Sequence, residues 1–99
     1  MSENCTYILQ CGDGSLYTGW TNDMQRRLQA HKSGQGAKYT RGRGPLTLVY
    51  LEQSDSRHQA MSREAQIKRL DRKGKMALIH SQSEAQRELI RQYDCGLVP

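Results

Sequence analysis

Two short apolar segments near the start of the chain predict a β-hairpin. Residues 6–11 (TYILQC) and residues 16–21 (LYTGWT) are rich in aromatic and β-branched side chains, which favour strands. The four residues between them, GDGS, are typical of a tight turn. We therefore expect the chain to open with two antiparallel strands.

The length of the turn decides which side chains share a face of this hairpin. If a three-residue loop places Gly14 in the left-handed region, Tyr17 lies opposite Leu9 and Gly19 lies opposite Tyr7. Tyr7 and Tyr17 then project from the same face. A two- or four-residue loop would instead place the two tyrosines on opposite faces.

The pattern then indicates a helix, a loop and a further strand. Residues 23–32 are expected to form a helix with Asn22 as its N-cap. Residues 33–45 contain too many glycines for a helix or a strand and predict a mobile basic loop. The apolar residues 46–52 predict a strand that is well covered by helices.

Three helices are expected in the second half, at about residues 56–70, 72–80 and 82–93. Each follows a side chain that can cap its first turn. These predicted caps are Ser56, with Gln59 as its capping-box partner, Asp71, and either Ser81 or Ser83. The order β-β-α-β-α-α-α predicts an α+β fold with a small, mainly antiparallel three-stranded sheet flanked by helices. A chain of 99 residues fits one such domain, with its core in residues 5–80.

Composition narrows the class of protein. No apolar run approaches the roughly 20 residues that span a bilayer, and the first residues, MSEN, lack the basic and apolar regions of a secretory signal. We therefore expect a cytoplasmic protein without membrane contact. The cysteines are odd in number and lack CxxC spacing, so reduced thiols are expected rather than disulfides or a zinc site; they are Cys5, Cys11 and Cys95.

The formal net charge of +5 is concentrated in one stretch of the chain. Six basic residues and no acidic residue lie between Asp23 and Glu52, whereas the remainder has nine basic and ten acidic residues. Such a localised excess favours a polyanionic partner such as nucleic acid. A basic surface without such a partner is the alternative.

The first predicted helix carries two cationic or titratable side chains on its apolar stripe. Met24, Arg27, Leu28 and His31 recur at i, i+3, i+4 and i+7, so they share one face. Arg27 and His31 either lie at the edge of the core with their polar groups in water, or line a cleft over the hairpin. In a cleft, the guanidinium can bind phosphate oxygens and the imidazole can transfer a proton.

One carboxylate in the second half is expected to face the apolar side of its helix. Glu64 follows Ala60 by four residues and precedes Ile67 by three, which is a costly position for an unpaired charge. A divalent cation would stabilise this carboxylate, because Mg²⁺ needs only one or two carboxylates together with water and substrate phosphate. The alternative is a surface ion pair with Lys68, four residues later.

These residues, in this order and spacing, resemble the catalytic pattern of the GIY-YIG nuclease superfamily. The matching positions are Cys5-Thr6-Tyr7, Tyr17-Thr18-Gly19, Arg27, His31 and Glu64. The resemblance is closest to the small stand-alone bacterial branch often called YhbQ-like, and it covers about residues 5–80. The chain departs from the pattern in the first two residues of the first tripeptide, at Thr18, and in lacking an asparagine that many members place late in the domain.

The resemblance implies a role for each of five residues. Glu64 would hold one Mg²⁺ or Mn²⁺ ion, and Arg27 would stabilise the negative charge of the transition state. Tyr7, with Tyr17 beside it, would activate or orient the attacking water, which requires the metal or neighbouring cations to lower the pKa of the phenol. His31 would orient a tyrosine or water, or assist proton transfer.

Further residues are expected to contact DNA. Gly19 would let the strand and the substrate backbone approach closely. The basic loop mixes cations with one aromatic residue, Tyr39, which would either stack on an unpaired base or pack over the first helix. The predicted contact residues are Arg26, Lys32, Lys38, Tyr39, Arg41, Arg43 and Lys68. A second basic cluster lies on later helices, where only some side chains can face DNA: Arg63, Lys68, Arg69, Arg72, Lys73 and Lys75.

The sequence therefore predicts a metal-dependent endonuclease that hydrolyses phosphodiester bonds in DNA, with repair or recombination as its setting. RNA is a second candidate substrate, and no protein partner is indicated. The alternatives are a nucleic-acid-binding module with the same fold and little or no cleavage activity, and a protein-interaction domain that uses the C-terminal helices. The inward carboxylate of Glu64 favours the enzyme, because a pure binder does not need a group that repels phosphate.

Overall fold

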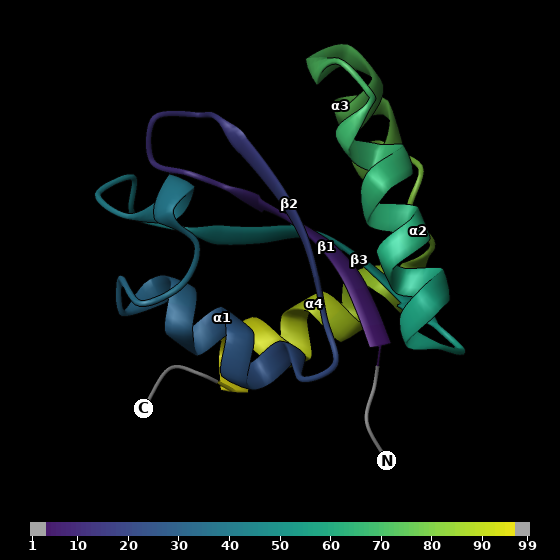
Figure 1. Cartoon of the computed structure of the whole chain (residues 1–99), viewed down its shortest axis with the longest axis horizontal. Helices are drawn as coiled ribbons and strands as arrows, with labels where there is room; N and C mark the ends of the chain where they lie inside the picture. The colour runs from purple at the N-terminus through teal and green to yellow at the C-terminus, as the bar shows by residue number, and fades with distance from the viewer. Residues whose placement is uncertain (1–3, 97–99) are drawn as a thin grey trace.

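The computed structural model describes residues 4–96 of the chain and confirms the predicted α+β fold. The element order is β-β-α-β-α-α-α, with one additional 3₁₀ turn in the basic loop (Figure 1). The elements are β1 (Asn4–Gln10), β2 (Leu16–Thr21), α1 (Met24–Lys32), η1 (Lys38–Thr40), β3 (Thr47–Ser54), α2 (Arg57–Lys68), α3 (Arg72–His80) and α4 (Glu84–Gly96).

The three strands form one antiparallel sheet in the order β2-β1-β3. The turn between β1 and β2 has Gly14 in the left-handed region, at a φ of 86°. Leu9 pairs with Tyr17, and Tyr7 pairs with Gly19. The structure therefore has the register of a three-residue loop, and both tyrosines project from the same face of the hairpin.

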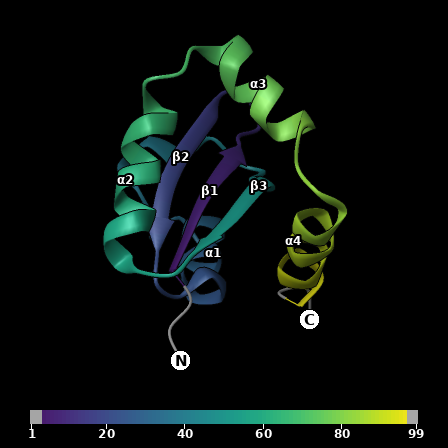
Figure 2. The ribbon, with the colours of Figure 1, turned by 90° about the vertical axis from the view of Figure 1, so that its right-hand side faces the viewer.

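Helices cover both faces of the sheet, and each face buries its own set of side chains. On one face Tyr7 and Leu9 pack with Leu28 of α1, and apolar residues of α4 complete the cover. On the other face Ile8 packs with Ile67 of α2. Figure 2 shows α2 and α4 on opposite sides of the sheet, and Figure 1 shows β2 passing between α1 and α2. The β2 edge is therefore flanked by α1 from one face and by α2 from the other.

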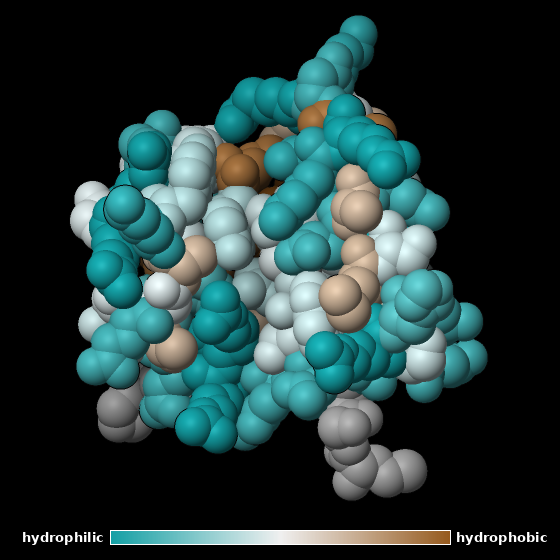
Figure 3. All heavy atoms as spheres, in the orientation of Figure 1, coloured by the Kyte–Doolittle hydropathy of each residue, from teal (hydrophilic) through white to brown (hydrophobic). Residues whose placement is uncertain are grey.

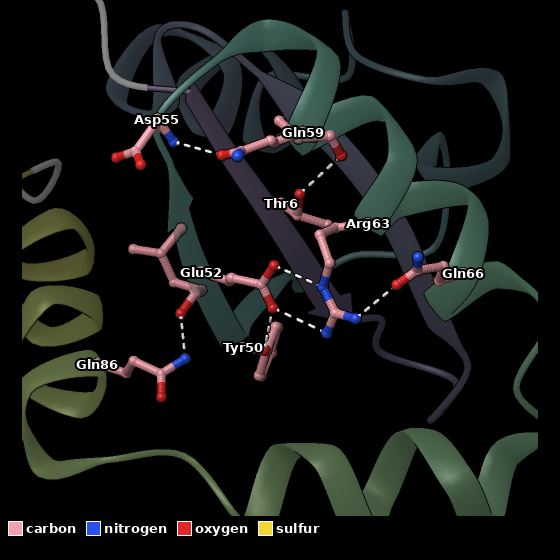
Figure 4. A network of polar contacts seen from close by, with 10 residues as sticks. Thr6, Tyr50, Glu52, Asp55, Gln59, Arg63, Gln66 and Gln86 are labelled. Atoms are coloured by element: carbon pink, nitrogen blue, oxygen red, sulfur yellow. Dashed lines mark hydrogen bonds and ion pairs between the residues drawn. The ribbon is translucent and has the colours of Figure 1, made fainter.

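A polar network ties α2 and α4 to β3 (Figure 4). The Arg63 guanidinium donates to the Glu52 carboxylate through Nε and Nη2, at 2.7 and 3.0 Å. Tyr50 donates its hydroxyl proton to the same carboxylate at 2.6 Å, and Gln86 of α4 donates to the Leu51 carbonyl at 2.9 Å. The side chain of Arg63, one of the cations of the second basic cluster, therefore stabilises the fold, and we do not expect it to contact DNA.

The helix caps follow the predictions with one exception. The N-cap of α1 is Asp23 and not Asn22, because the Asp23 carboxylate accepts the backbone N–H of Arg26 at 3.2 Å. The hydroxyl of Thr21 accepts the Asp23 N–H at 3.0 Å, which delays the start of the helix by one residue. The other caps are confirmed, with Ser83 rather than Ser81 before α4: Ser56, Asp71 and Ser83.

The capping box of α2 is only half formed, and the basic loop has more structure than expected. Ser56 accepts the Gln59 N–H at 3.1 Å, but the Gln59 side chain accepts from Asp55 N–H at 3.0 Å instead of returning to Ser56 (Figure 4). In the loop, the prediction of no regular structure is wrong at η1, where Thr40 is buried. The Gly12 N–H donates to the Arg43 carbonyl at 2.5 Å, which ties the loop to the β1–β2 turn.

Two of the three cysteines have side chains that the structure describes. Cys5 and Cys11 are buried thiols, and the side chain of Cys95 lies outside the described part of the chain. None of the helices within residues 4–96 is long and apolar enough to cross a membrane.

Candidate active site

The centre of the site is a hydrogen bond between Tyr7 of β1 and His31 of α1. The Tyr7 hydroxyl oxygen lies 2.8 Å from His31 Nε2, and both side chains are almost completely buried. Helical periodicity places His31 on the stripe of α1 that faces the sheet, together with Met24 and Leu28. The same periodicity that builds the core therefore brings an imidazole to the phenol.

Thr40 of η1 fixes the proton positions on the His31 imidazole. The Thr40 hydroxyl donates to the Ala37 carbonyl at 2.9 Å, so its oxygen accepts from His31 Nδ1, which lies 3.0 Å away. Nδ1 therefore carries the proton, and Nε2 accepts the hydrogen bond that Tyr7 donates. The imidazole thus presents a basic nitrogen to the phenol.

Two glycines make room for this pair. A Cβ at Gly19, the cross-strand partner of Tyr7, would lie 2.5 Å from the Tyr7 hydroxyl oxygen and 2.7 Å from Cζ. A Cβ at Gly36 would overlap the His31 ring, at 2.7 Å from Cγ. The expectation that Gly19 makes room for substrate is therefore corrected: the space beside it is filled by the phenol of Tyr7.

Burial keeps the histidine unprotonated and the tyrosine protonated in the absence of substrate. Loss of solvation, with a smaller effect of the Arg27 cation, lowers the pKa of His31 to about 4. Loss of solvation also raises the pKa of Tyr7 to about 12, although Arg27 acts in the opposite direction. At neutral pH a neutral imidazole therefore faces a neutral phenol.

Arg27 lies half-buried beside both tyrosines. Interaction with the Tyr7 phenol is the largest influence on the pKa of Arg27 and raises it, and Tyr17 acts in the same direction. A hollow of about 310 Å³ adjoins the guanidinium and is also lined by Arg26 and Asn22. Of the two polar groups on the α1 stripe, Arg27 therefore borders a hollow at the start of α1, whereas His31 is buried against the sheet.

Tyr17 connects the buried pair to the basic loop through a stack of side chains. Its ring centroid lies 5.4 Å from that of His31, and it stacks on Tyr39 with centroids 5.8 Å apart and 25° between the ring planes. The Arg43 guanidinium lies 4.3 Å from the Tyr39 centroid and pairs with Asp13 of the β1–β2 turn at 2.6 Å. Tyr39 therefore packs on Tyr17 and Arg43 rather than over α1.

Glu64 of α2 approaches these residues from the other face of the sheet. Its negative charge is one of the influences that raise the pKa of Tyr7, so the two groups lie close enough to interact. The side chain is 23% exposed, and its carboxylate lies 3.5 Å from Lys68 Nζ. The structure therefore shows the ion pair of Glu64 with Lys68, one of the two interpretations of this carboxylate.

The surroundings of Glu64 fit one hard divalent cation. Among the described residues only Lys68 forms an ion pair with this carboxylate, at a distance longer than a strong hydrogen bond, which leaves oxygen lone pairs open. No group of three histidine, cysteine or acidic side chains suited to a metal occurs within residues 4–96. A cation bound by Glu64 would therefore take its other ligands from water and phosphate, as Mg²⁺ and Mn²⁺ can.

Comparison with known proteins identifies the family to which this arrangement belongs. Residues 3–77 match the model of the GIY-YIG catalytic domain. The chain belongs to the GIY-YIG family. It is 56% identical over 80 residues to a UPF0213 protein of Clostridium perfringens, which covers 81% of this chain and 86% of that protein. It is 52% identical over 85 residues to one of Syntrophus aciditrophicus, covering 85% and 98%.

The fold of this GIY-YIG domain also agrees with a solved structure. The solution NMR structure of a UPF0213 protein from Bacillus halodurans is 41% identical in sequence, covers 97% of each chain and superposes with a TM-score of 0.56. The resemblance inferred from the two tripeptides and three further residues is thereby confirmed, together with the nuclease fold that it implies.

Two residues of the GIY-YIG domain that contact His31 were missed by sequence reasoning. Thr40 orients His31, and Gly36 leaves room for its ring. Both lie in the glycine-rich basic loop, whose composition indicated only irregular backbone. The cluster of glycines was the available signal, since a glycine is required where a ring packs directly against the chain.

The predicted DNA-contact residues of the GIY-YIG domain fall into two groups. Two of them are ion-paired within the fold: Arg43 with Asp13, and Lys68 with Glu64. Four cations, whether or not they have partners, have exposed side chains on α1 and the loop: Arg26, Lys32, Lys38 and Arg41. The exposed group leaves a positively charged surface on the side of the cleft formed by α1 and the loop.

Proposed function

We propose that the protein is a divalent-metal-dependent endonuclease that hydrolyses phosphodiester bonds in DNA. The observation that carries this proposal is the buried hydrogen bond between Tyr7 and His31, with the Arg27 guanidinium beside the same phenol. The charge of Glu64 also acts on the pKa of Tyr7. Membership of the GIY-YIG family supports it, because nuclease activity is typical of this superfamily.

Arg27 is the residue best suited to hold the scissile phosphate. A guanidinium can donate two parallel hydrogen bonds to phosphate oxygens, and a half-buried cation acts through less water than an exposed one. The same charge would stabilise the additional negative charge that develops in the transition state. Flanking phosphates would be bound by the exposed cations of α1 and the loop: Arg26, Lys32, Lys38 and Arg41.

The Tyr7–His31 pair would carry the proton of the attacking water. Because the Tyr7 hydroxyl donates to His31, its oxygen can accept a proton from water. As that proton moves to the Tyr7 oxygen, the phenol proton moves to His31 Nε2, hydroxide adds to phosphorus, and the bond to the leaving oxygen breaks. The leaving oxygen takes a proton from solvent, and His31 returns its additional proton through Tyr7 to solvent when the product leaves, which restores the neutral pair. The negative charge of a bound phosphate would favour the imidazolium, which keeps its Nδ1–H bond to Thr40.

Glu64 would hold the divalent cation. When bound, this cation supplies electrostatic stabilisation of the phosphate and of the leaving oxygen. The carboxylate itself contributes no proton to the path described above. Its ion pair with Lys68 places a second cation beside it, which offsets the repulsion between Glu64 and an incoming phosphate.

Cleavage of a panel of nucleic acids tests the proposal directly. Purified protein is incubated with duplex, nicked, single-stranded and branched DNA and with RNA, in Mg²⁺, Mn²⁺ or EDTA. We expect metal-dependent cleavage of DNA that is lost in Glu64→Gln and Arg27→Ala. Glu84→Gln, an exposed carboxylate on α4, serves as the matched control and should cleave as the wild type does.

The same assay separates the enzyme from a binding module. Tight, salt-sensitive DNA binding without cleavage, unaffected by Glu64→Gln, would contradict the proposal and favour a module that only binds. Cleavage that persists equally in every variant would show a contaminating nuclease. A single small domain offers few contacts to base edges, so we expect DNA structure rather than sequence to guide cleavage, as suits repair or recombination.

A further inference from the structure

We propose that Tyr39 of η1 and Arg43 of the basic loop form a stacking platform for an unpaired nucleobase beside the candidate active site. The preferred substrate is then DNA with unpaired bases, such as a single strand or a branch. The identity of the ligand rests on the proposed function. The sequence left two roles open for Tyr39 and placed Arg43 only among the cations that contact DNA.

The two side chains of the platform lie against each other and remain open to solvent. Arg43 Cζ lies 4.3 Å from the centroid of the Tyr39 ring. Tyr39 is 42% exposed and is the only aromatic residue among the large exposed apolar side chains of residues 4–96, and the Arg43 side chain is 40% exposed. Proteins stack unpaired bases on aromatic rings and on guanidinium planes. The platform offers both kinds of surface at one place.

Contacts with the β1–β2 turn hold Arg43 in place. Its guanidinium pairs with the Asp13 carboxylate at 2.6 Å, and its carbonyl accepts the Gly12 N–H at 2.5 Å. Asp13 is itself fixed, because it accepts the N–H of Ser15 at 3.0 Å and the hydroxyl of Ser15 at 2.6 Å. A group that is already ordered loses little conformational entropy when a ligand binds to it. The guanidinium is therefore preorganised for stacking.

The ion pair with Asp13 favours a base over a phosphate as the ligand of this platform. The carboxylate balances the charge of Arg43 and would repel a phosphate group placed beside it. A nucleobase carries no net charge, so it can stack on the guanidinium while the ion pair stays intact. The phosphate of the same nucleotide would instead meet Lys38 and Arg41, which are exposed on the same loop. Figure 3 shows hydrophilic side chains around this loop and the hairpin turn, at the left of the view.

A series of ring contacts joins the platform to the proposed reacting centre. Tyr39 stacks on Tyr17 with centroids 5.8 Å apart, and the Tyr17 centroid lies 5.4 Å from that of His31. His31 in turn is bonded to Tyr7. A base on the platform would therefore belong to a nucleotide close to the scissile phosphate. In an intact duplex the neighbouring base pairs cover both faces of a base, so only an unpaired base can occupy this position.

Stacking quenches the fluorescence of 2-aminopurine, an adenine analogue, so this base measures the platform without cleavage. The full-length protein is titrated in EDTA with short single-stranded DNA in which the analogue replaces adenine, and with the same strand in a duplex. The wild type should quench the single strand. Arg43→Lys, which keeps the charge but loses the plane, and Tyr39→Leu, which loses the ring, should each abolish this quenching. Each should also weaken single-strand binding at least roughly fivefold and leave duplex binding unchanged.

A matched control and a restoring variant separate stacking from charge and from folding. Arg91→Lys changes an exposed arginine of α4 that is also paired with carboxylates, and it should bind both DNAs as the wild type does. If Tyr39→Leu melts at a lower temperature than the wild type, Tyr39→Phe decides: wild-type quenching in that variant supports the platform, and lost quenching overturns it. Wild-type binding without quenching, unchanged quenching in Arg43→Lys, or an equal loss of duplex binding in Arg43→Lys also overturns it.

The results for the platform and for the proposed nuclease can be distinguished. Quenching that depends on Tyr39 and Arg43, without cleavage in Mg²⁺ or Mn²⁺, supports the platform and contradicts the enzyme. Metal-dependent cleavage by a protein that does not quench the analogue supports the enzyme and contradicts the platform. If the wild-type protein binds no nucleic acid, both proposals are wrong.

Discussion

Protonation of His31 should destabilise the fold as the pH falls below neutrality. The pKa of this imidazole is 6.5 in an unfolded chain and about 4 in the folded protein. Between these values the unfolded state binds the additional proton, so the stabilisation is fully present above pH 6.5 and is lost as the pH approaches 4. The whole difference corresponds to about 3.4 kcal/mol, of which about 2.5 kcal/mol is lost by roughly pH 4.5. His31 is 1% exposed, so solvent screening reduces this value little.

Urea denaturation from about pH 7.5 to pH 4.5 measures this loss. His31→Gln should be less stable than the wild type throughout, because Tyr7 loses its partner, but it should lose about 2.5 kcal/mol less over this range. His58→Gln, an exposed residue of α2, is the control and should follow the wild type. The reasoning is refuted if the wild type and His31→Gln lose the same free energy of unfolding.

Three further substitutions test other parts of the account. Gly19→Ala should lower the free energy of unfolding by about 1–3 kcal/mol and reduce cleavage, because its Cβ would displace the Tyr7 phenol. Wild-type stability and cleavage in this variant would show that the strand adjusts freely. Thr18→Val should raise stability by about 1 kcal/mol, since the buried hydroxyl has no hydrogen-bond partner among residues 4–96; a lower urea midpoint would contradict this. Arg27→Lys should slow cleavage at least roughly tenfold, because an ammonium keeps the charge but cannot donate two parallel hydrogen bonds to the phosphate. An unchanged cleavage rate would show that the charge alone suffices.

Local signals in the sequence were sufficient for the strands and the helix order, and they limited the hairpin register to a few alternatives. The turn residues allowed a three-residue loop with Gly14 in the left-handed region but did not exclude other lengths, and the structure shows that loop, with Tyr7 opposite Gly19. The one cap that was wrong, Asn22 instead of Asp23, involves two adjacent residues with similar capping ability. The choice between them depends on the Thr21 hydroxyl, a contact that helix signals do not include.

The contacts within the candidate site were harder to predict from the sequence, because they join residues that are far apart along the chain. Periodicity placed Arg27 and His31 on one stripe, but it did not show that His31 is buried and bonded to Tyr7. Thr40 was missed because its contact with His31 depends on the conformation of a glycine-rich loop. Glu64 was predicted to face inward from its helix, but its approach to Tyr7 depends on tertiary packing across the sheet edge.

The most direct test asks whether Tyr7 and Glu64 act on the same phosphate. Single-turnover cleavage rates are measured for Tyr7→Phe, Glu64→Gln and the double variant. Residues that serve one reacting group have strongly non-additive effects, so the double variant should be no slower than the slower single variant. A double variant slowed by the product of the two single effects, or a single variant that cleaves as fast as the wild type, would contradict the account.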